Sequence, residues 1–298
     1  MILKLSKTIF VFQKILMNIR LFFELIKFRL SFLVTFSAVF GFLLSSNYIN
    51  YFSLFILIIS GFFITGSSII NNQIIEKDSD KLMNRTKNRP LPTNKISSRN
   101  ALFISLALSI TGLILMVLFL NKLTALLSFF SLIIYTFLYT PLKKVGPIAV
   151  FVGAIPGALP PLIGWAASTN DISLEALIIF SIQFIWQFPH FWAIAWVSDD
   201  DYKRAGFKLL PNNGKKNFST AVNIMTYTMF LIPLGLLPTI FGITGLISGV
   251  VAVVCAILFL IQTLRLIKDY SKTSALRIMF GSFIYLPVVQ LTYIFDKV

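Results

Sequence analysis

The chain has 298 residues, of which 57% are hydrophobic and only 12% are charged. Soluble domains are roughly 45–50% apolar, so this composition excludes an ordinary soluble protein and indicates an integral membrane protein. The net charge of +15 does not indicate nucleic-acid binding, because the basic residues are sorted by loop in a way that binding to nucleic acid does not require.

Apolar stretches recur along the whole chain, and each is long enough to cross a hydrocarbon core of about 30 Å as a helix. They predict an all-α, polytopic membrane protein with nine transmembrane helices. We expect these helices at residues 30–48, 52–75, 101–120, 123–140, 148–167, 174–197, 219–240, 242–262 and 277–295. Internal prolines make the fifth the least regular.

The basic residues gather in alternate loops. Of the 26 Lys and Arg residues, all but Lys122 and Lys297 fall in the N-terminal arm or in the loops after the second, fourth, sixth and eighth predicted helices. Cytoplasmic loops of membrane proteins carry such an excess. The pattern predicts a multi-pass protein of the cell inner (plasma) membrane, with its N-terminus and charged loops in the cytoplasm and its C-terminus outside.

Residues 1–27 are basic and apolar, which predicts a cytoplasmic arm at the membrane interface, where its cations meet anionic lipid. Residues 28–298 are expected to form one helical domain. The single cysteine, Cys255, lies within the eighth predicted helix. A lone cysteine excludes a disulfide framework and a thiolate metal cluster.

The segment 71–92 carries an acidic cluster that is unusual in so apolar a chain. Asn72, Glu76 and Asp80 follow one another at intervals of four, so they share one helix face where the second helix leaves the membrane. Asp78 points elsewhere unless the helix unwinds. Carboxylate and amide oxygens without His or Cys are ligands for a hard cation such as Mg²⁺.

Basic residues follow these acids, and guanidinium groups hold phosphate oxygens in a fork. The residues concerned are Arg85, Lys87 and Arg89, with Lys143 and Lys144 in a neighbouring loop. A second acidic run, Asp199 to Asp201, is also followed by bases, including Lys203. Together the two loops indicate a magnesium-diphosphate site, although loop charges of both signs can also form only a solvated face with weak ion pairs.

The segment "NQIIEKDSDKLMNRTKNRPLP" (72–92) resembles the first signature of the UbiA superfamily of intramembrane prenyltransferases, in which Asn and two Asp are spaced by four and followed by Arg-Thr and Arg-Pro. Two further stretches resemble one member family, the protoheme IX farnesyltransferases or haem O synthases. They are "YTPLKKVGPIAVFVGAIPGALPPLIGWAA" (139–167) and "WQFPHFWAIAWVSDDDYKRAGFKLLP" (186–211). The resemblance runs from about residue 25 to the end, and it implies a nine-helix bundle around a central cavity open towards lipid.

That resemblance implies transfer of a farnesyl group from farnesyl diphosphate to the 2-vinyl group of haem B, giving haem O, with Mg²⁺ as cofactor. The implied metal ligands are Asn72, Glu76, Asp78, Asp80 and Asp201, and the implied catalytic residues are Asp78, Asp80, Asp201 and Arg85. The implied diphosphate ligands are Asn72, Arg85, Lys87, Arg89, Lys143, Lys144 and Lys203. The family usually has Asp where this chain has Glu76. In the second motif, Tyr202 and Ala205 replace an aspartate of the wider superfamily, as is typical of the haem branch.

His190 is the only histidine, and it lies in the second half of the sixth predicted helix. Haem iron commonly takes a His ligand, so, given the family resemblance, we expect His190 to bind haem. Tyr202, in the second motif, is expected to contact haem as well. A hydrogen bond from His190 to a neighbouring helix, or proton transfer, is the alternative. The fifth helix is rich in Gly and Pro. This composition predicts either that the helix lines a cavity or that it packs closely on its neighbours. Both alternatives place the helix inside the bundle.

Three other functions fit parts of the pattern. A related prenyltransferase would use a quinone precursor or another aromatic acceptor. A transporter would place its polar groups on broken helices near mid-membrane, whereas these acids lie at the rim. A haem-binding assembly factor would need no diphosphate site. If haem O is the product, a haem A synthase or an oxidase-assembly factor would be the partner that receives it.

Overall fold

The computed structural model describes residues 19–298, and in that range it contains nine helices long and apolar enough to cross a membrane. The expected all-α architecture is therefore confirmed for the described part of the chain. The spans are α2 (Phe28–Ser45), α3 (Tyr51–Ile75), α5 (Ser98–Phe119), α6 with η1 and α7 (Lys122–Ile133, Ile134–Tyr139, Thr140–Leu142), α8 (Ile148–Thr169), α9 (Leu174–Val197), α12 (Phe218–Ile240), α13 (Leu246–Asp269) and α14 (Lys272–Phe295).

The last two helices do not begin at the predicted residues, 242 and 277, because the local turn and cap determine where each helix starts. The turn after α12 contains Gly242 at φ 68°, a left-handed conformation that glycine adopts without a steric penalty, and α13 begins only at Leu246. In α14, the Ser271 side chain accepts a hydrogen bond from the Ser274 N–H. This N-cap starts the helix at Lys272, five residues earlier than expected.

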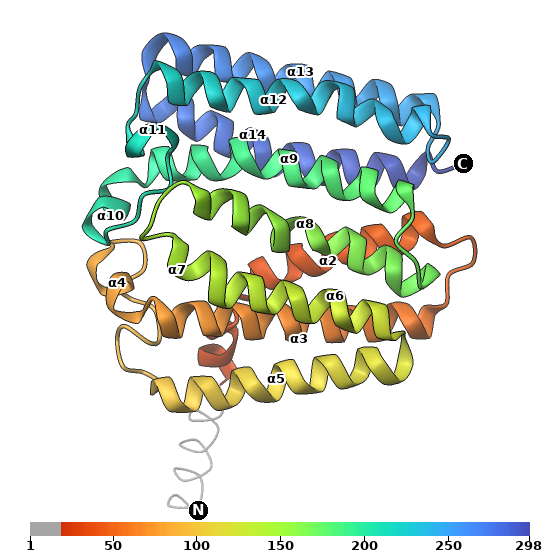
Figure 1. Ribbon diagram of the computed structural model, residues 1–298, viewed down its shortest axis with the longest axis horizontal. Helices are drawn as coiled ribbons and strands as arrows, with labels where there is room; N and C mark the ends of the chain where they lie inside the picture. Colours follow the sequence, from red (N-terminus) through yellow and green to blue (C-terminus); the bar gives the residue numbers. More distant parts are fainter. Residues whose placement is uncertain (1–18) are drawn as a thin grey trace, which may run out of the picture.

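The longer loops lie at one end of the bundle, on the left of Figure 1, and contain α4 (Lys77–Leu82), α10 (Asp199–Arg204) and α11 (Pro211–Gly214). The C-terminus lies at the opposite end. This arrangement has the alternation that the loop charges predicted. Most of the predicted interfacial arm falls outside the described residues, of which 19–25 are helical.

Helix α8 lies in the middle of the bundle and is mostly buried. It packs directly on α2: a Cβ atom at Gly164 would stand 1.8 Å from the carbonyl oxygen of Ala38, and one at Gly41 would stand 1.9 Å from that of Pro161. Only glycine permits this approach of two backbones. The expected interior position of the fifth span is thus confirmed.

The prolines of α8 do not interrupt the helix, and side chains from other helices bind the carbonyl groups that two of them, Pro160 and Pro161, leave free. Pro161 has no N–H to donate to the carbonyl of Gly157, and Gln183 of α9 donates its amide there instead, at 2.8 Å. The carbonyl left free by Pro160 belongs to Pro156, and it accepts the Ser131 hydroxyl at 3.4 Å. The expected irregularity is therefore wrong at the level of the backbone.

The fourth span changes to a π-helix, η1, at the end that meets the charged loops. In the wider turn the Tyr135 carbonyl accepts the Thr140 N–H, and it also accepts the Thr140 hydroxyl at 2.8 Å. The wider turn also places Tyr135 and Tyr139 on the interior of the bundle, where both line a cavity. π-Bulges are frequently found at functional sites.

Candidate active site

A cavity of about 460 Å³ opens inside the bundle. One wall is formed by α2, α3, α4 and η1, and the other by α8, α9 and α14, so segments more than 200 residues apart face the same space. The first wall carries most of the charged groups. The second wall carries aromatic and neutral polar groups.

Asn72, Glu76 and Asp80 all line the cavity, as their spacing predicted. Helix α3 ends at Ile75, yet the four-residue spacing survives the change to α4. The Glu76 N–H donates to the Asn72 carbonyl at 2.9 Å, and the Asp80 N–H donates to the Glu76 carbonyl at 2.7 Å. The three side chains therefore stay on one face, although two separate helices hold them.

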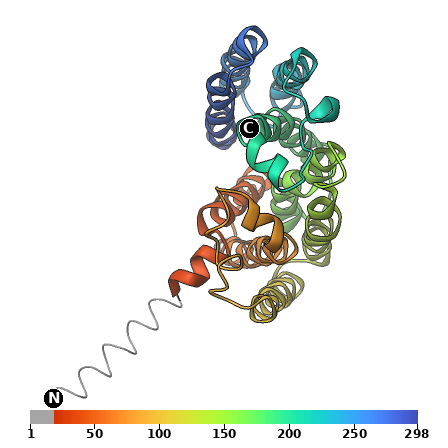
Figure 2. The same cartoon turned by 90° about the vertical axis from the view of Figure 1, so that its left-hand side faces the viewer.

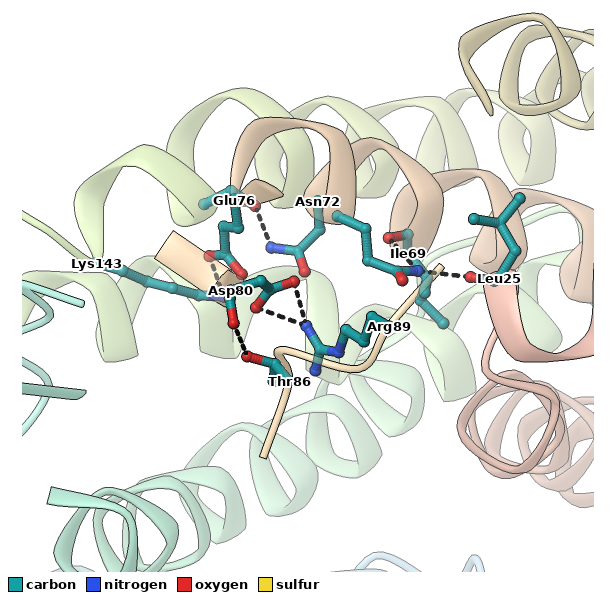
Figure 3. A network of polar contacts seen from close by, with 10 residues as sticks. Leu25, Ile69, Asn72, Glu76, Asp80, Thr86, Arg89 and Lys143 are labelled. Carbon is teal, nitrogen blue, oxygen red and sulfur yellow. Dashed lines mark hydrogen bonds and ion pairs between the residues drawn. The ribbon is translucent and has the colours of Figure 1, made fainter. Parts of the chain in front are cut away.

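Each carboxylate of this wall is paired with a cation (Figure 3). Arg89 donates to both oxygens of Asp80, at 2.9 and 2.7 Å, and the Asp80 side chain is completely buried. Lys143 Nζ lies 2.7 Å from Glu76 Oε1 in a pair that is almost fully buried. Charges removed from water in this way require a close partner, so both pairs fix the shape of the wall.

The loop after α4 folds back to bring Arg89 to Asp80. The Thr86 hydroxyl donates to the Asp80 carbonyl at 2.9 Å, and the Arg89 N–H donates to the Thr86 carbonyl at 3.0 Å. Arg85 also lines the cavity at its mouth, with its side chain exposed to solvent. The loop thus presents two guanidinium groups to one space.

Lys143 joins the two sides of the charged wall. Its ammonium lies 4.5 Å from the Tyr139 ring, in a cation–π contact. A Cβ atom at position 153 would stand 2.5 Å from that ring, so Gly153 makes room for it. Burial disfavours the charged amine, but the Glu76 carboxylate outweighs it and raises the pKa of Lys143 above its usual value. The Lys143 amine therefore stays charged throughout the neutral range.

Lys27 is a cavity residue that sequence reasoning did not identify. It precedes α2 in a left-handed conformation, with φ 47°. Burial, followed by the positive charges of Arg89 and Lys143, lowers the pKa of Lys27 to about 7. Its position directly before an apolar span was the available signal, but the same position suits a lysine at the lipid interface.

The second charged loop reaches the first one through Asp201. Its carboxylate accepts the N–H groups of Asn84 and Arg85, at 3.0 and 3.2 Å, and it pairs with Arg204. Partial burial alone would raise the pKa of Asp201. The hydrogen bonds and the Arg204 charge outweigh it, so the pKa is lowered. Helices α4 and α10 are in contact at the end of the bundle (Figure 2).

Other predicted residues lie outside the cavity lining. Asp78 is exposed and pairs with Lys81 at 2.8 Å, and Lys203 pairs with Asp199 at 2.9 Å. Two more predicted bases, Lys87 and Lys144, have exposed side chains. The structure thus brings together one part of the predicted set, which comprises Asn72, Glu76, Asp80, Arg85, Arg89 and Lys143.

Both predicted haem contacts line the cavity, but they lie on different helices, His190 on α9 and Tyr202 on α10, and in different surroundings. His190 lines the cavity and stacks on Trp186, with ring centroids 4.6 Å apart and planes at 17°. Tyr202 lines the cavity near its charged mouth, and its ring packs on Phe207. Sequence reasoning missed Trp186, because one tryptophan in a membrane helix carries no signal of its own.

The oxygen donors of the α3 wall fit a magnesium ion bound together with phosphate. Among the described residues, no three His, Cys, Asp or Glu side chains form a metal-holding group by themselves. Magnesium, however, commonly takes one or two carboxylates and completes its shell with water and substrate phosphates. Glu76 and Asp80, with the amide of Asn72, supply that donor set on one face.

A membrane cavity with buried acid–base pairs on one wall and aromatic side chains on the other defines an intramembrane enzyme that handles an amphiphile with an anionic head. The model of the UbiA prenyltransferase family matches residues 34–286. The chain belongs to the UbiA prenyltransferase family.

Similar proteins agree with this membership. The chain is 49% identical over 278 residues to a protoheme IX farnesyltransferase of Cytophaga hutchinsonii, covering 93% of this chain and 97% of that one. It is 43% identical to one of Flavobacterium psychrophilum, covering 93% and 94%. Among solved structures, a digeranylgeranylglyceryl phosphate synthase has the same fold, with a TM-score of 0.78, 22% identity and coverage of 93% and 98%. A UbiA homologue from Archaeoglobus fulgidus, bound to DMAPP and Mg²⁺, has a TM-score of 0.67 at 17% identity, covering 90% and 99%.

Proposed function

We propose that the chain is a protoheme IX farnesyltransferase, which transfers the farnesyl group of farnesyl diphosphate to the 2-vinyl group of haem B and releases diphosphate. The product is haem O. Relatives of 41 to 49% identity over 93% of the chain carry this name. The sequence resemblance pointed to the same activity.

One structural observation supports the proposal most directly. A single cavity holds the paired acids and bases of the α3 wall and, on its other wall, the only histidine of the chain. A diphosphate head and a haem could then meet in one space. A quinone-type acceptor carries no iron for that histidine to bind.

The charged wall would bind the diphosphate head. Arg85, Arg89, Lys143 and Lys27 line the cavity with cationic groups, and such groups stabilise the negative charge that grows as the C–O bond of the prenyl diphosphate breaks. Magnesium, held by Asn72, Glu76 and Asp80, would neutralise part of the same charge. The UbiA homologue of known structure that binds DMAPP also binds Mg²⁺.

Breaking that bond leaves an allylic cation, which must survive until the vinyl group attacks it. Tyr135 and Tyr139 line the cavity beside the charged wall, and aromatic faces stabilise a cation without reacting with it. The vinyl group then forms the new carbon–carbon bond. Water adds to the resulting cation on the haem side and loses a proton, which gives the hydroxyethylfarnesyl side chain.

Asp201 and Asp78, predicted as metal ligands and catalytic residues, lie outside the cavity lining, so we propose other roles for them. Asp201 would hold the Arg85 backbone in place. Asp78, with Lys87, Lys144 and Lys203, would contribute only weakly to binding from the mouth of the cavity. Tyr202 would contact the haem edge nearest that mouth. The chain is a multi-pass membrane protein, and we propose that it lies in the inner (plasma) membrane with its charged loops in the cytoplasm, where a haem A synthase or an oxidase-assembly factor could receive the product.

A turnover assay tests the proposal. Purified protein is incubated with haem B, farnesyl diphosphate and Mg²⁺, and the haem fraction is examined by mass spectrometry. We expect a haem species heavier by one hydroxyfarnesyl unit. No such species should form when farnesol replaces farnesyl diphosphate. Unchanged haem B from folded protein would contradict the proposed function.

A further inference from the structure

His190 of α9 is hydrogen-bonded to a serine on another helix. Its Nδ1 atom lies 2.8 Å from the Oγ atom of Ser282 in α14, and both residues are buried. The same Oγ atom lies 2.6 Å from the carbonyl oxygen of Met279. The contact joins residues 92 positions apart in the chain.

These two distances determine where the hydrogens lie. A carbonyl oxygen can only accept, so the single hydroxyl hydrogen of Ser282 points to Met279. The Oγ atom then has no hydrogen left for His190, and the Nδ1 atom must carry the hydrogen of their bond. A neutral imidazole has one N–H group. The Nε2 atom of His190 is therefore left with its lone pair.

The surroundings of the ring favour this neutral form. Its ring contacts are Trp186, Phe191 and Phe283, none of which could balance the charge of an imidazolium. Ser282 also fixes the stacked tryptophan, because the Trp186 indole N–H donates to the Ser282 carbonyl at 3.0 Å. One serine thus orients two rings of α9.

The free nitrogen belongs to a residue that lines the cavity. His190 lines it, and among the hydrogen bonds of the described residues its Nε2 atom has no partner. Histidines that bind metals usually donate their other ring N–H to a nearby acceptor, which fixes both tautomer and orientation. The Ser282 hydroxyl is such an acceptor here.

We infer that Ser282 is a positioning residue, which fixes His190 with its Nε2 lone pair towards the cavity so that this atom binds the iron of the haem substrate. The inference rests on the proposed function, since it needs haem as the occupant of the α9 wall. It adds a residue on α14 to the haem site and a direction of binding, from Nε2 to iron.

The tautomer can be measured directly, because His190 is the only histidine of the chain. Protein labelled with ¹⁵N-histidine, purified through a tag without histidine, gives the two nitrogen signals of one ring. We expect the protonated signal to belong to Nδ1, and Ser282→Ala to shift the ring towards the other tautomer. A hydrogen on Nε2 in the unaltered protein would overturn the inference, whether or not any variant folds.

Haem titration measures the consequence. The Soret band is followed as haem B is added to the unaltered chain and to its Ser282→Ala, Ser282→Thr and His190→Ala variants. We expect His190→Ala to lose the spectrum of a histidine-bound iron, and Ser282→Ala to weaken haem binding about tenfold. Ser282→Thr, which keeps the hydroxyl, should restore most of the affinity.

The control is Ser60→Ala, which removes a buried hydroxyl of α3 that donates only to carbonyls of its own helix. It should leave haem binding unchanged. Equal affinity and equal spectra for Ser282→Ala and the unaltered chain would reject the inference. Failure of the proposed function would instead appear as unchanged haem B in the turnover assay, and the NMR result would be unaffected.

Discussion

The two charged loops have a similar order of acids and bases, yet they occupy different places in the site. In the first loop, Glu76 and Asp80 are buried in the cavity wall and paired with Lys143 and Arg89. In the second loop, Asp201 binds backbone N–H groups of the first. The two similar loops thus have different roles. The first contributes side chains to the cavity, and the second holds the first in position.

The largest effect should follow loss of the buried carboxylate of the first loop. Asp80→Asn should lower turnover about 10³-fold, because it removes charge where the diphosphate and its metal bind. The initial rate of haem O formation measures this loss. Asp80→Asn/Arg89→Gln leaves no unpaired buried charge, so it should fold, as thermal unfolding in detergent would check, and it should still lack turnover because Arg89 is itself a proposed diphosphate ligand.

The matched control is Asp78→Asn. Its exposed side chain pairs only with Lys81, so its rate should stay within about threefold of the unaltered chain, in the range of a surface ion pair. An equal loss from both variants would mean that α4 turns during the reaction and brings Asp78 into the site.

Lys143→Met should come next. It leaves Glu76 buried without its cation, which should cost about 3 kcal/mol of stability and lower turnover about 10²-fold. Thermal unfolding in detergent and the initial rate measure the two effects. Glu76→Gln/Lys143→Met should regain stability but not activity, whereas exposed Lys144→Met should leave stability unchanged and turnover within about threefold. Recovery of activity in the double variant would show that the pair is only structural.

A smaller effect is expected from the second loop. Asp201→Asn should lower turnover about thirtyfold, because the loop that carries Arg85 loses its anchor and misplaces a binding group. The neighbouring Asp200 is exposed, so Asp200→Asn should leave turnover unchanged. If Asp201→Asn were as harmful as Asp80→Asn, the two loops would share one role.

The pH dependence of Asp201 has a definite sign. Its pKa is lowered in the folded chain, so the contact between the loops is complete above the ordinary aspartate range and is lost only when the pH falls through the lowered value. The contact should therefore remain throughout the range used for turnover. A loss of loop contact near neutral pH, detected by hydrogen exchange at Asn84 and Arg85, would contradict this geometry.

The smallest effect concerns Lys27, beside the first loop. With a pKa of about 7, its ammonium is charged at pH 6 and mostly neutral at pH 8. An anionic head binds the charged form better, so the unaltered chain should bind farnesyl diphosphate about tenfold more tightly than Lys27→Met at pH 6. The difference should shrink towards pH 8. Comparing the two proteins cancels the titration of the diphosphate itself.

The sequence predicted the helices and the charged end of the bundle because both depend on local patterns. Apolar length determines a span, and the spacing of Asn72, Glu76 and Asp80 determines a helix face. Their common face persisted across the break after Ile75, since the hydrogen bonds of successive turns continue there. Those three residues were correctly grouped for this reason.

The remaining geometry depends on contacts between distant segments. No spacing relates Asp201 to the backbone of Arg85, or His190 to Ser282, because helix packing brings each pair together. The similar composition of the two charged loops could not show which acids are buried. The π-helix that turns Tyr139 towards the cavity is likewise a matter of backbone hydrogen bonding that composition does not record.

The central claim is that one cavity holds two substrates on separate walls. Its most direct test is a set of four dissociation constants, those of farnesyl diphosphate with Mg²⁺ and of haem B, each measured on Asp80→Asn and on His190→Ala. We expect Asp80→Asn to weaken only the diphosphate and His190→Ala to weaken only haem. The reverse pattern, or equal loss of both ligands in both variants, would contradict the account.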